Sequence, residues 1–300
     1  MLDLRRMRIL REVALHGTIR SAAQALSFSP SAVSQQVSAL ERELGVRLLV
    51  RNGRGVRLTD AGRALVDRTE TLLAQLAAAE SEARALDGAS AQTVRVAAFP
   101  SAAATIVADA VRGLDGSLTA AIVEADPTLG LARVRSSEVE LALVWEYEYV
   151  PLTLPPGIEV EHLLDDPVHV LVPRGHRVGG KTAVELAHLG DERWINSTPL
   201  SSCHPFVPRA CHAAGFTPQI AAETNDHRTL HELVASGVGL ALVSRLSLLE
   251  IAPGVVAVPI APPGLHRRIH AAFRRERRNE PALADMLSRL RAAAAGRSLA

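Results

Sequence analysis

Residues 27–55 carry the strongest signals for local structure in this chain of 300 residues. The apolar residues of the segment recur at intervals of three and four, at Val33, Val37, Leu40 and Leu44. This spacing predicts an amphipathic helix with one buried face. Ser29 followed by Pro30 is typical of a helix start, and Gly45 is typical of a helix end.

A hairpin is expected directly after this helix, because two runs of β-forming residues flank Asn52-Gly53. Asn-Gly between such runs is the strongest short signal for a β-hairpin. Residues 4–14 and 19–26, ahead of the helix, also have apolar residues at helical spacing. Three short helices and a hairpin predict a winged helix-turn-helix in residues 1–58, with the helix that starts after Ser29 as its recognition helix.

Polar side chains gather in the first turns of that helix, where a recognition helix reaches base edges. Solvation alone would explain one polar helix face. Arginines concentrate around it, however, since residues 1–57 hold ten Arg and four acidic residues while the whole chain has a net charge of +1. This combination favours DNA binding. The candidate DNA-binding residues are Ser29, Ser31, Ser34, Gln35, Gln36, Ser38, Arg51 and Arg54.

Residues 59–88 read as one long helix that Thr59 can cap. Its apolar seam alternates steps of four and three residues, at Leu65, Thr69, Leu72, Leu76, Ala79, Ala83 and Leu86. A heptad seam on a solitary helix of this length predicts a partner helix, and hence a dimer. The alternative is that the seam packs on its own domain.

From Thr93 onward the sequence alternates between strand and helix patterns. Such alternation predicts a parallel sheet with helices on both faces. About 200 residues of this pattern, with a crossing near Asp165 and a return near Gly264, fit two lobes. The predicted lobes are residues 93–164 with 265–300, and residues 165–264.

Ligands of open α/β sheets bind outside the carboxyl ends of the strands, near helix N-termini. Four places meet this condition, and their candidate effector-binding residues are Pro100, Ser101, Ala102, Trp145, Glu146, Asn196, Ser197, Thr198, Asn225 and Asp226. Trp145 offers a stacking face in a chain with 3% aromatic residues. Glu146 and Asp226 suit a cationic or amino-bearing effector better than an anion. The alternative for each residue is a helix cap or a turn.

The segment SAAQALSFSPSAVSQQVSALERELGVRLLVRNGRGVRLTDAG resembles the DNA-binding signature of LysR-type transcriptional regulators. That signature has paired Ala in the second helix, SxxAVSxxIxxLExxLGxxLFxR in the third, and LTxAG at the start of the linker helix. The sequence departs from it at Leu49-Val50, in place of the common Leu-Phe, and at Gln35, where Arg is frequent. The base preference at Gln35 is therefore this chain's own.

The resemblance implies an α+β multi-domain fold: a winged helix-turn-helix, a long linker helix, and a two-lobed α/β effector domain like a periplasmic binding protein. It implies a sequence-specific transcriptional regulator whose C-terminal domain binds a small-molecule effector that alters oligomer shape and promoter activity. The expected partners are double-stranded promoter DNA, further copies of the chain in a dimer or tetramer, and RNA polymerase. A ligand-independent DNA-binding protein is the alternative.

Cys203-His204 and Cys211-His212 raise two other functions, metal binding and redox sensing. Positions eight apart on a helix are ~12 Å apart, too far for one tetrahedral site, so no metal is expected. A peroxide-sensing branch of the LysR family carries a disulfide-forming cysteine pair in about this region, which makes a redox sensor a further alternative.

The sequence contains no GxSxG, P-loop, HExxH, or GxGxxG after a strand, so it predicts neither an enzyme nor a cofactor beyond the effector. It also has no apolar leader and no uncharged apolar run of membrane-spanning length. These features predict a cytoplasmic protein without membrane contact.

Overall fold

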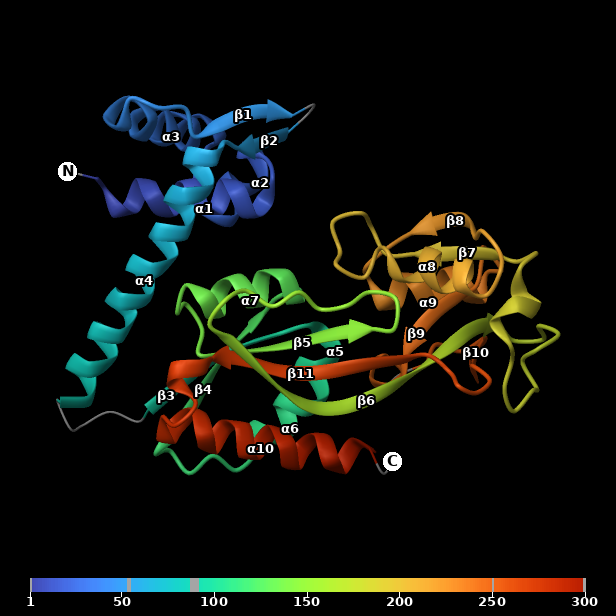
Figure 1. The fold of residues 1–300 in the computed structure, drawn as a ribbon. Helices are drawn as coiled ribbons and strands as arrows, with labels where there is room; N and C mark the ends of the chain where they lie inside the picture. Colours follow the sequence, from blue (N-terminus) through green and yellow to red (C-terminus); the bar gives the residue numbers. More distant parts are fainter. Residues whose placement is uncertain (1, 53–54, 87–91, 250, 299–300) are drawn as a thin grey trace. The chain divides into compact units, whose positions relative to one another are not determined.

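Figure 1 shows the computed structural model, which describes residues 2–52, 55–86, 92–249 and 251–298. The chain divides into two compact units. The first is Met1–Ser90 with Arg135–Glu138, and the second is Ala91–Val134 with Val139–Ala300. The domain and lobe limits expected from the sequence remain predictions.

The N-terminal unit is a winged helix-turn-helix followed by a long helix, as the sequence predicts. Its elements are α1 (Leu4–His16), α2 (Ile19–Ala25), α3 (Pro30–Leu44), β1 (Leu49–Asn52), β2 (Gly55–Leu58) and α4 (Asp60–Leu86). Strands β1 and β2 pair antiparallel and form the wing, from Leu49 opposite Leu58 to Asn52 opposite Gly55. Gly53 and Arg54, which the sequence places in the predicted hairpin turn, lie outside the described residues.

Helix α3 has the predicted start and end. The Ser29 hydroxyl accepts a hydrogen bond from the Ala32 N–H at 3.2 Å, which satisfies one donor of the first turn. Gly45 ends the helix in the left-handed conformation, with φ +70°. The predicted apolar stripe is buried in the core that α1, α2 and α3 share, at Val33, Val37 and Leu40.

The wing joins α4 through a close backbone approach. The Thr59 hydroxyl donates to the Arg47 carbonyl at 2.8 Å and accepts from the Gly62 N–H at 3.0 Å. The Thr59 N–H donates to the Leu48 carbonyl at 2.9 Å. A Cβ at Gly62 would overlap that carbonyl oxygen and lie 3.1 Å from its carbon. Glycine is therefore required at position 62 by contact, although its backbone is helical.

Helix α4 exposes part of its predicted seam. Leu72 and Leu76 are 43% and 48% exposed, whereas Thr69 is buried and donates to the Leu65 carbonyl at 2.7 Å. The side chains of Ala79, Ala83 and Leu86 lie outside the described part of the chain. The described seam therefore leaves two adjacent leucines on the surface of one protomer.

The second unit is built on a sheet with the strand order β10-β6-β11-β5-β3-β4, in which β9 also pairs with β6. Strands β7 and β8 form a separate two-stranded sheet. The strands are β3 (Gln92–Ala98), β4 (Leu118–Glu124), β5 (Leu141–Tyr147), β6 (Ile158–Pro173), β7 (Arg193–Asn196), β8 (Gln219–Glu223), β9 (Ala241–Ser244), β10 (Val255–Pro259) and β11 (His266–Arg274).

The prediction of a parallel sheet is only partly correct. Strand β3 runs parallel to β4 and β5, and β7 runs parallel to β8. Strand β11 is antiparallel to β5 and β6, and β6 is antiparallel to β9 and β10. Strand β6 is long enough for its first part to pair with β11 and its last part with β9 and β10. One strand thus serves both halves of the unit.

Helices cover both faces of the sheet. The helical segments are α5 (Pro100–Ala102), the π-helix Ala103–Val107, α6 (Ala108–Val111), α7 (Pro127–Arg135), α8 (Phe206–Ala213), α9 (His227–Ala235), α10 (Pro281–Ser298) and the short 3-10 helices Leu186–Leu189, Arg245–Ser247 and Arg275–Arg277. Along β5, Leu141 and Leu143 face the core that contains α10, while Ala142 and Val144 face the core that contains α7. This alternation is the two-sided burial that the helix–strand pattern predicts.

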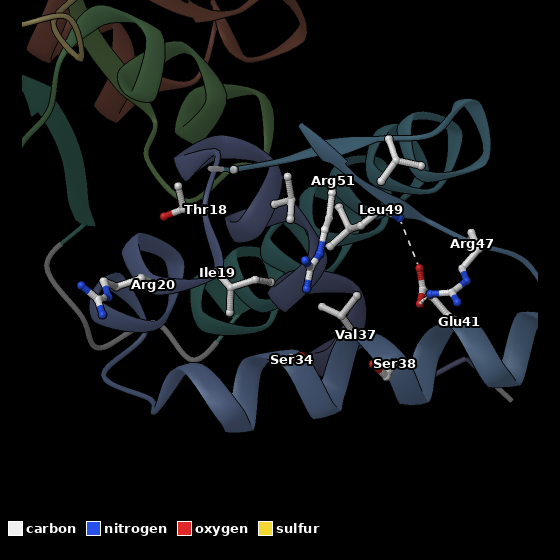
Figure 2. A pocket seen from close by; sticks show the side chains of 13 residues that line it. Thr18, Ile19, Arg20, Ser34, Val37, Ser38, Glu41, Arg47, Leu49 and Arg51 are labelled. Atoms are coloured by element: carbon white, nitrogen blue, oxygen red, sulfur yellow. Dashed lines mark hydrogen bonds and ion pairs between the residues drawn. The ribbon is translucent and has the colours of Figure 1, made fainter. Parts of the chain in front are cut away.

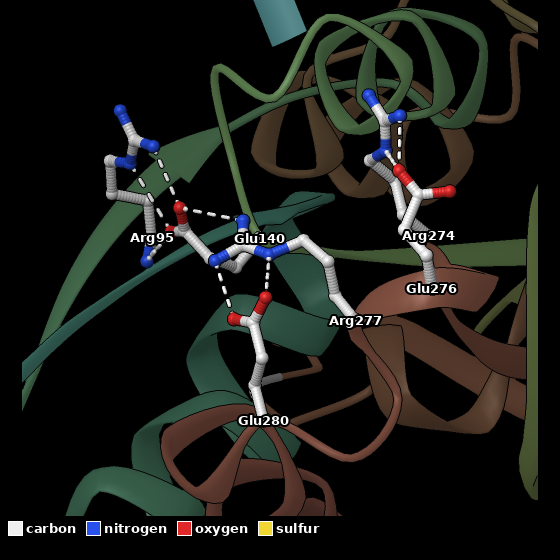
Figure 3. Close-up of polar contacts among 6 residues, drawn as sticks. All are labelled: Arg95, Glu140, Arg274, Glu276, Arg277 and Glu280. Carbon is white, nitrogen blue, oxygen red and sulfur yellow. Dashed lines mark hydrogen bonds and ion pairs between the residues drawn. The ribbon is translucent and has the colours of Figure 1, made fainter. Parts of the chain in front are cut away.

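An ion cluster ties β3 to the start of α10 (Figure 3). The Glu140 carboxylate, in a residue that is 8% exposed, accepts hydrogen bonds from the main chain and guanidinium of Arg95, both at 2.7 Å. Arg277 donates to Glu140 at 3.3 Å and to Glu280 at 2.6 Å. Burial alone would raise the pKa of Glu140, but the bonds and charges of both arginines outweigh it and lower that pKa. The cluster thus fixes the last helix to the sheet.

Candidate functional site

The surface of α3 presents a row of short polar side chains. Ser31, Ser34, Gln35 and Ser38 are all exposed, whereas Val33, Val37 and Leu40 are buried on the opposite side. The period of 3.6 residues produces this separation, because the two sets fall on different faces of one helix. The structure therefore brings four of the predicted DNA-binding residues onto one exposed face.

Two further candidates in the same helix make local contacts. The Ser29 hydroxyl caps the helix and lies 3.0 Å from the Ser31 hydroxyl. The Gln36 side chain is half-buried and accepts a hydrogen bond from the Arg6 guanidinium at 3.1 Å. Both side chains already accept hydrogen bonds within the domain, so they are less available to DNA than their neighbours.

A groove of about 500 Å³ lies between α3 and the wing (Figure 2). Its lining includes Ser34 and Ser38 from α3, and three arginines, Arg20, Arg47 and Arg51. Arg51 was a sequence candidate, whereas Arg20 and Arg47 were missed because nothing in their local pattern distinguishes them from other surface arginines. Arg54 lies outside the described residues.

Glu41 couples α3 to the wing at one end of this groove. Its carboxylate accepts hydrogen bonds from the N–H group of Leu48 at 2.8 Å and from that of Leu49 at 3.2 Å, the second of which is drawn in Figure 2. Charge-assisted bonds of this kind are stronger than neutral ones. The polar face of α3 and the basic wing are therefore held at a fixed spacing.

The second unit encloses a cavity of about 330 Å³. Six of the ten predicted effector residues line it: Pro100, Ser101, Trp145, Asn196, Ser197 and Asn225. They come from the start of α5, the end of β5, the end of β7 and the segment before α9. The residues chosen because they follow the carboxyl ends of strands therefore lie mostly around one cavity.

Glu146 and Asp226 are not among the residues that line the cavity. Alternation along β5 directs Glu146 away from Trp145, and its carboxylate pairs with Arg268 at 3.0 Å. The Asp226 carboxylate caps α9 by accepting the Thr229 N–H at 2.7 Å, and that bond lowers its pKa. Neither carboxylate supports the amino-bearing effector for which it was invoked.

Ala102 and Thr198 are also absent from the cavity wall. Ala102 is fully buried in the core behind it. Thr198 is held by Asn225, whose side chain accepts from the Thr198 N–H at 3.0 Å and donates to its hydroxyl at 2.7 Å. Thr198 thus orients a lining residue without lining the cavity itself.

The most deeply buried charge at the cavity was missed from the sequence. Arg267 is 6% exposed and donates two hydrogen bonds to Asp166, which is fully buried, at 3.1 and 2.6 Å. It also donates to the Ser101 hydroxyl at 3.0 Å, and its guanidinium lies 4.9 Å from the centre of the Phe99 ring. The two charges are 101 positions apart in sequence, so no local pattern could have paired them.

Tyr147 and Cys203 form another part of the wall. The Tyr147 hydroxyl lies 3.2 Å from the Ser244 hydroxyl and 3.9 Å from the Cys203 sulfur. Burial is the main cause that raises the pKa of both Tyr147 and Cys203. Cys211 is fully buried in the hydrophobic core, and burial raises its pKa to about 12. Two protonated thiols react slowly with oxidants.

Across the described ranges, no three His, Cys, Asp or Glu side chains converge as a metal site would require. Within those ranges every helix is too short or too polar to cross a lipid bilayer.

A winged helix-turn-helix joined to an α/β domain with an internal cavity defines a DNA-binding transcriptional regulator with an effector-binding domain. Residues 4–63 match the model of the bacterial regulatory helix-turn-helix protein, lysR family, and residues 87–295 match the LysR substrate binding domain. The chain belongs to the LysR family of transcriptional regulators.

Individual relatives resemble the chain over most of its length. The RuBisCO operon transcriptional regulator of Allochromatium vinosum is 29% identical over 81% of this chain and 79% of its own. A probable hydrogen peroxide-inducible genes activator of Streptomyces viridosporus is 31% identical over 80% of this chain and 77% of its own. The solved structure of full-length CbnR with its target DNA has a TM-score of 0.58 and 20% identity, over 97% of this chain and all of that one, which shows a shared fold.

Proposed function

We propose that the exposed face of α3 reads the base edges of promoter DNA. The observation that carries this proposal is the row of hydroxyl and amide groups at Ser31, Ser34, Gln35 and Ser38, all exposed on one side of the helix. Groups of this kind hydrogen-bond bases in the major groove. Gln35 is the residue best suited to set base preference, since an amide can pair with adenine through two hydrogen bonds.

The arginines of the groove serve a different role. Arg51 of the wing, together with Arg54, contacts the phosphate backbone and holds α3 in register on the duplex. Arg20 and Arg47 line the same groove and add to this grip. Phosphate contacts carry no sequence information, so their loss weakens binding to every DNA alike.

Promoter binding tests this assignment. The full chain should bind a fragment of its own promoter region in a mobility-shift assay, with an affinity that falls steeply as salt rises. Arg51→Ala should weaken binding to all fragments and lower the salt slope by about one. Arg112→Ala is the matched control, because this arginine has a 79% exposed side chain and lies in the other unit. Equal effects of the two changes would refute the role of Arg51.

The exposed leucines of α4 support a dimer through that helix. Leu72 and Leu76 leave an apolar strip that a second copy of α4 would cover. Leu72→Glu should convert the assembly to monomers, as measured by light scattering after size-exclusion chromatography. Gln75→Glu, an exposed position on the same helix, should leave the mass unchanged. Further association of dimers would give the tetramer.

The cavity of the second unit is the proposed effector site, and its volume favours ligand control over ligand-independent binding. The raised thiol pKa values argue against redox control through Cys203 and Cys211.

We further propose that the chain performs no catalysis, acts in the cytoplasm where promoter DNA lies, and contacts RNA polymerase at the promoter. Effector binding would then change the arrangement of the paired α3 helices.

A further inference from the structure

Carboxylates outnumber cations around the effector cavity. Glu124 at the end of β4 and Asp126 ahead of α7 line it, and Arg267 is the one Lys or Arg in the described lining. Asp166 stands directly behind Arg267. Burial, followed by the charge of Arg267, lowers the pKa of His227, so this lining histidine is neutral near pH 7. The wall therefore carries net negative charge.

The charge of Arg267 is largely neutralised by its buried partner Asp166. Its guanidinium is already paired with a fully buried carboxylate through two hydrogen bonds, and a third bond reaches Ser101. A ligand carboxylate placed beside it would also meet the fields of Glu124 and Asp126. Like charges at short range disfavour binding, because no favourable interaction offsets the free energy needed to desolvate the anion.

Two acceptors of the cavity, Asn196 and Glu124, lack donors among the described residues, whereas Asp126 accepts from Ser202. Asn196 is 2% exposed, and its amide nitrogen donates to the His204 carbonyl at 3.1 Å, which fixes the orientation of the amide. The Asn196 Oδ1 atom is then buried without a hydrogen-bond donor among the described residues. Glu124 is exposed at the cavity, and its carboxylate has neither an ion pair nor a hydrogen bond from the described parts of the chain. The buried Asn196 oxygen without a donor is costly, and a ligand that donates to it would relieve that cost, while Glu124 leaves a carboxylate free to pair with a cation.

We propose that the effector is a small organic amine: a molecule with an apolar, flat body and a protonated amino group, not a carboxylate. The body would lie on the aromatic wall of Trp145 and Tyr147, whose ring centres are 5.1 Å apart. The amino group donates to Glu124 and Asn196. Cationic groups also gain from aromatic faces. The proposal rests on the assignment of this cavity as the effector site.

Three probes of one skeleton isolate the charge: 2-phenylethylamine, 2-phenylethanol and phenylacetate. Calorimetric titration of the full chain should give an affinity for the amine at least about tenfold above that for phenylacetate, with the alcohol between them. Glu124→Gln should weaken amine binding by about threefold or more and leave alcohol binding unchanged. Glu185→Gln is the matched control, since its side chain is 67% exposed and lies outside the cavity lining.

Tryptophan fluorescence reports where the probe binds. Trp145 lines the cavity, whereas Trp194 is fully buried and does not. The amine should quench wild-type fluorescence, and Trp145→Phe should abolish the quenching. If phenylacetate binds as tightly as the amine, or if none of the three probes binds, the proposal that the effector is an amine is overturned. Heat of binding without any change in Trp145 fluorescence overturns the cavity as the effector site instead.

Discussion

Replacing Gly62 by alanine has two opposing effects on the stability of the N-terminal unit. Alanine in place of a helical glycine normally stabilises a helix by about 1 kcal/mol. At Gly62, however, the new Cβ would overlap the Leu48 carbonyl oxygen and lie 3.0 Å from the Leu58 side chain. Leu48 would have to move, and its carbonyl accepts the Thr59 N–H at 2.9 Å. The wing and α4 would then lose their close approach.

The magnitude follows from these two terms. Overpacking of a tight contact costs about 1–3 kcal/mol, which exceeds the propensity gain. We expect a net loss of about 1–2 kcal/mol in the free energy of unfolding of the N-terminal unit. For a unit of this size that is a decrease of about 4–15 °C in Tm. Promoter affinity should fall as well, because the wing shifts relative to α3.

Gly296→Ala is the matched control, since Gly296 also lies in a helix and a Cβ there would meet nothing within 4 Å. Melting followed by far-UV circular dichroism reports both units, whereas the fluorescence of Trp145 and Trp194 reports the second unit. Gly62→Ala should lower the circular dichroism transition, and Gly296→Ala should leave it unchanged or raise it. A Tm for Gly62→Ala at or above that of the wild type would refute the account of this junction.

Three further predictions concern the second unit. Asp166→Ala leaves the Arg267 guanidinium buried without its partner, so it should cost about 3–5 kcal/mol of stability, and a loss below about 1 kcal/mol in urea unfolding would contradict the buried pair. Because burial raises the thiol pKa values, Cys203 and Cys211 should react slowly with iodoacetamide at pH 7.5, and peroxide should form no disulfide between them by mass spectrometry. Burial lowers the pKa of His231, so unfolding takes up a proton and stability should fall as pH drops below about 6.5. His231→Phe should reduce that slope without removing it, because burial also lowers the pKa of His169, His227 and His270, and an unchanged slope would exclude His231 as a contributor.

The N-terminal unit could be predicted from the sequence because its signals are local. The cap at Ser29, the apolar stripe of α3 and the end at Gly45 all lie within one helix, and each determines structure over a few residues. The same locality explains why Glu41 was missed. Its role is to accept two N–H groups seven and eight positions away, across the turn into the wing.

The sheet and the cavity depended on distant pairings. Residues 158–161 alternate between apolar and polar side chains, a strand pattern that was missed, and this part of β6 pairs antiparallel with β11. The sequence pointed to the end of β5, where Trp145 lines the cavity, but it did not separate the two faces of the strand, because Trp145 and Glu146 point to opposite sides. Arg267 and Asp166 belong to two different strands, and only the register of β6 with β11 makes them partners.

The base preference of Gln35→Ala tests the central claim that α3 reads promoter DNA. Wild-type and variant chains would each select from a library of operator fragments in which every base pair is varied, at one fixed salt concentration. We predict that the variant loses discrimination at one or two adjacent base pairs, by about 1–3 kcal/mol, and keeps the wild-type preference elsewhere. An unchanged preference at every position, with or without a uniform loss of affinity, would contradict the assignment of α3 as the reading helix.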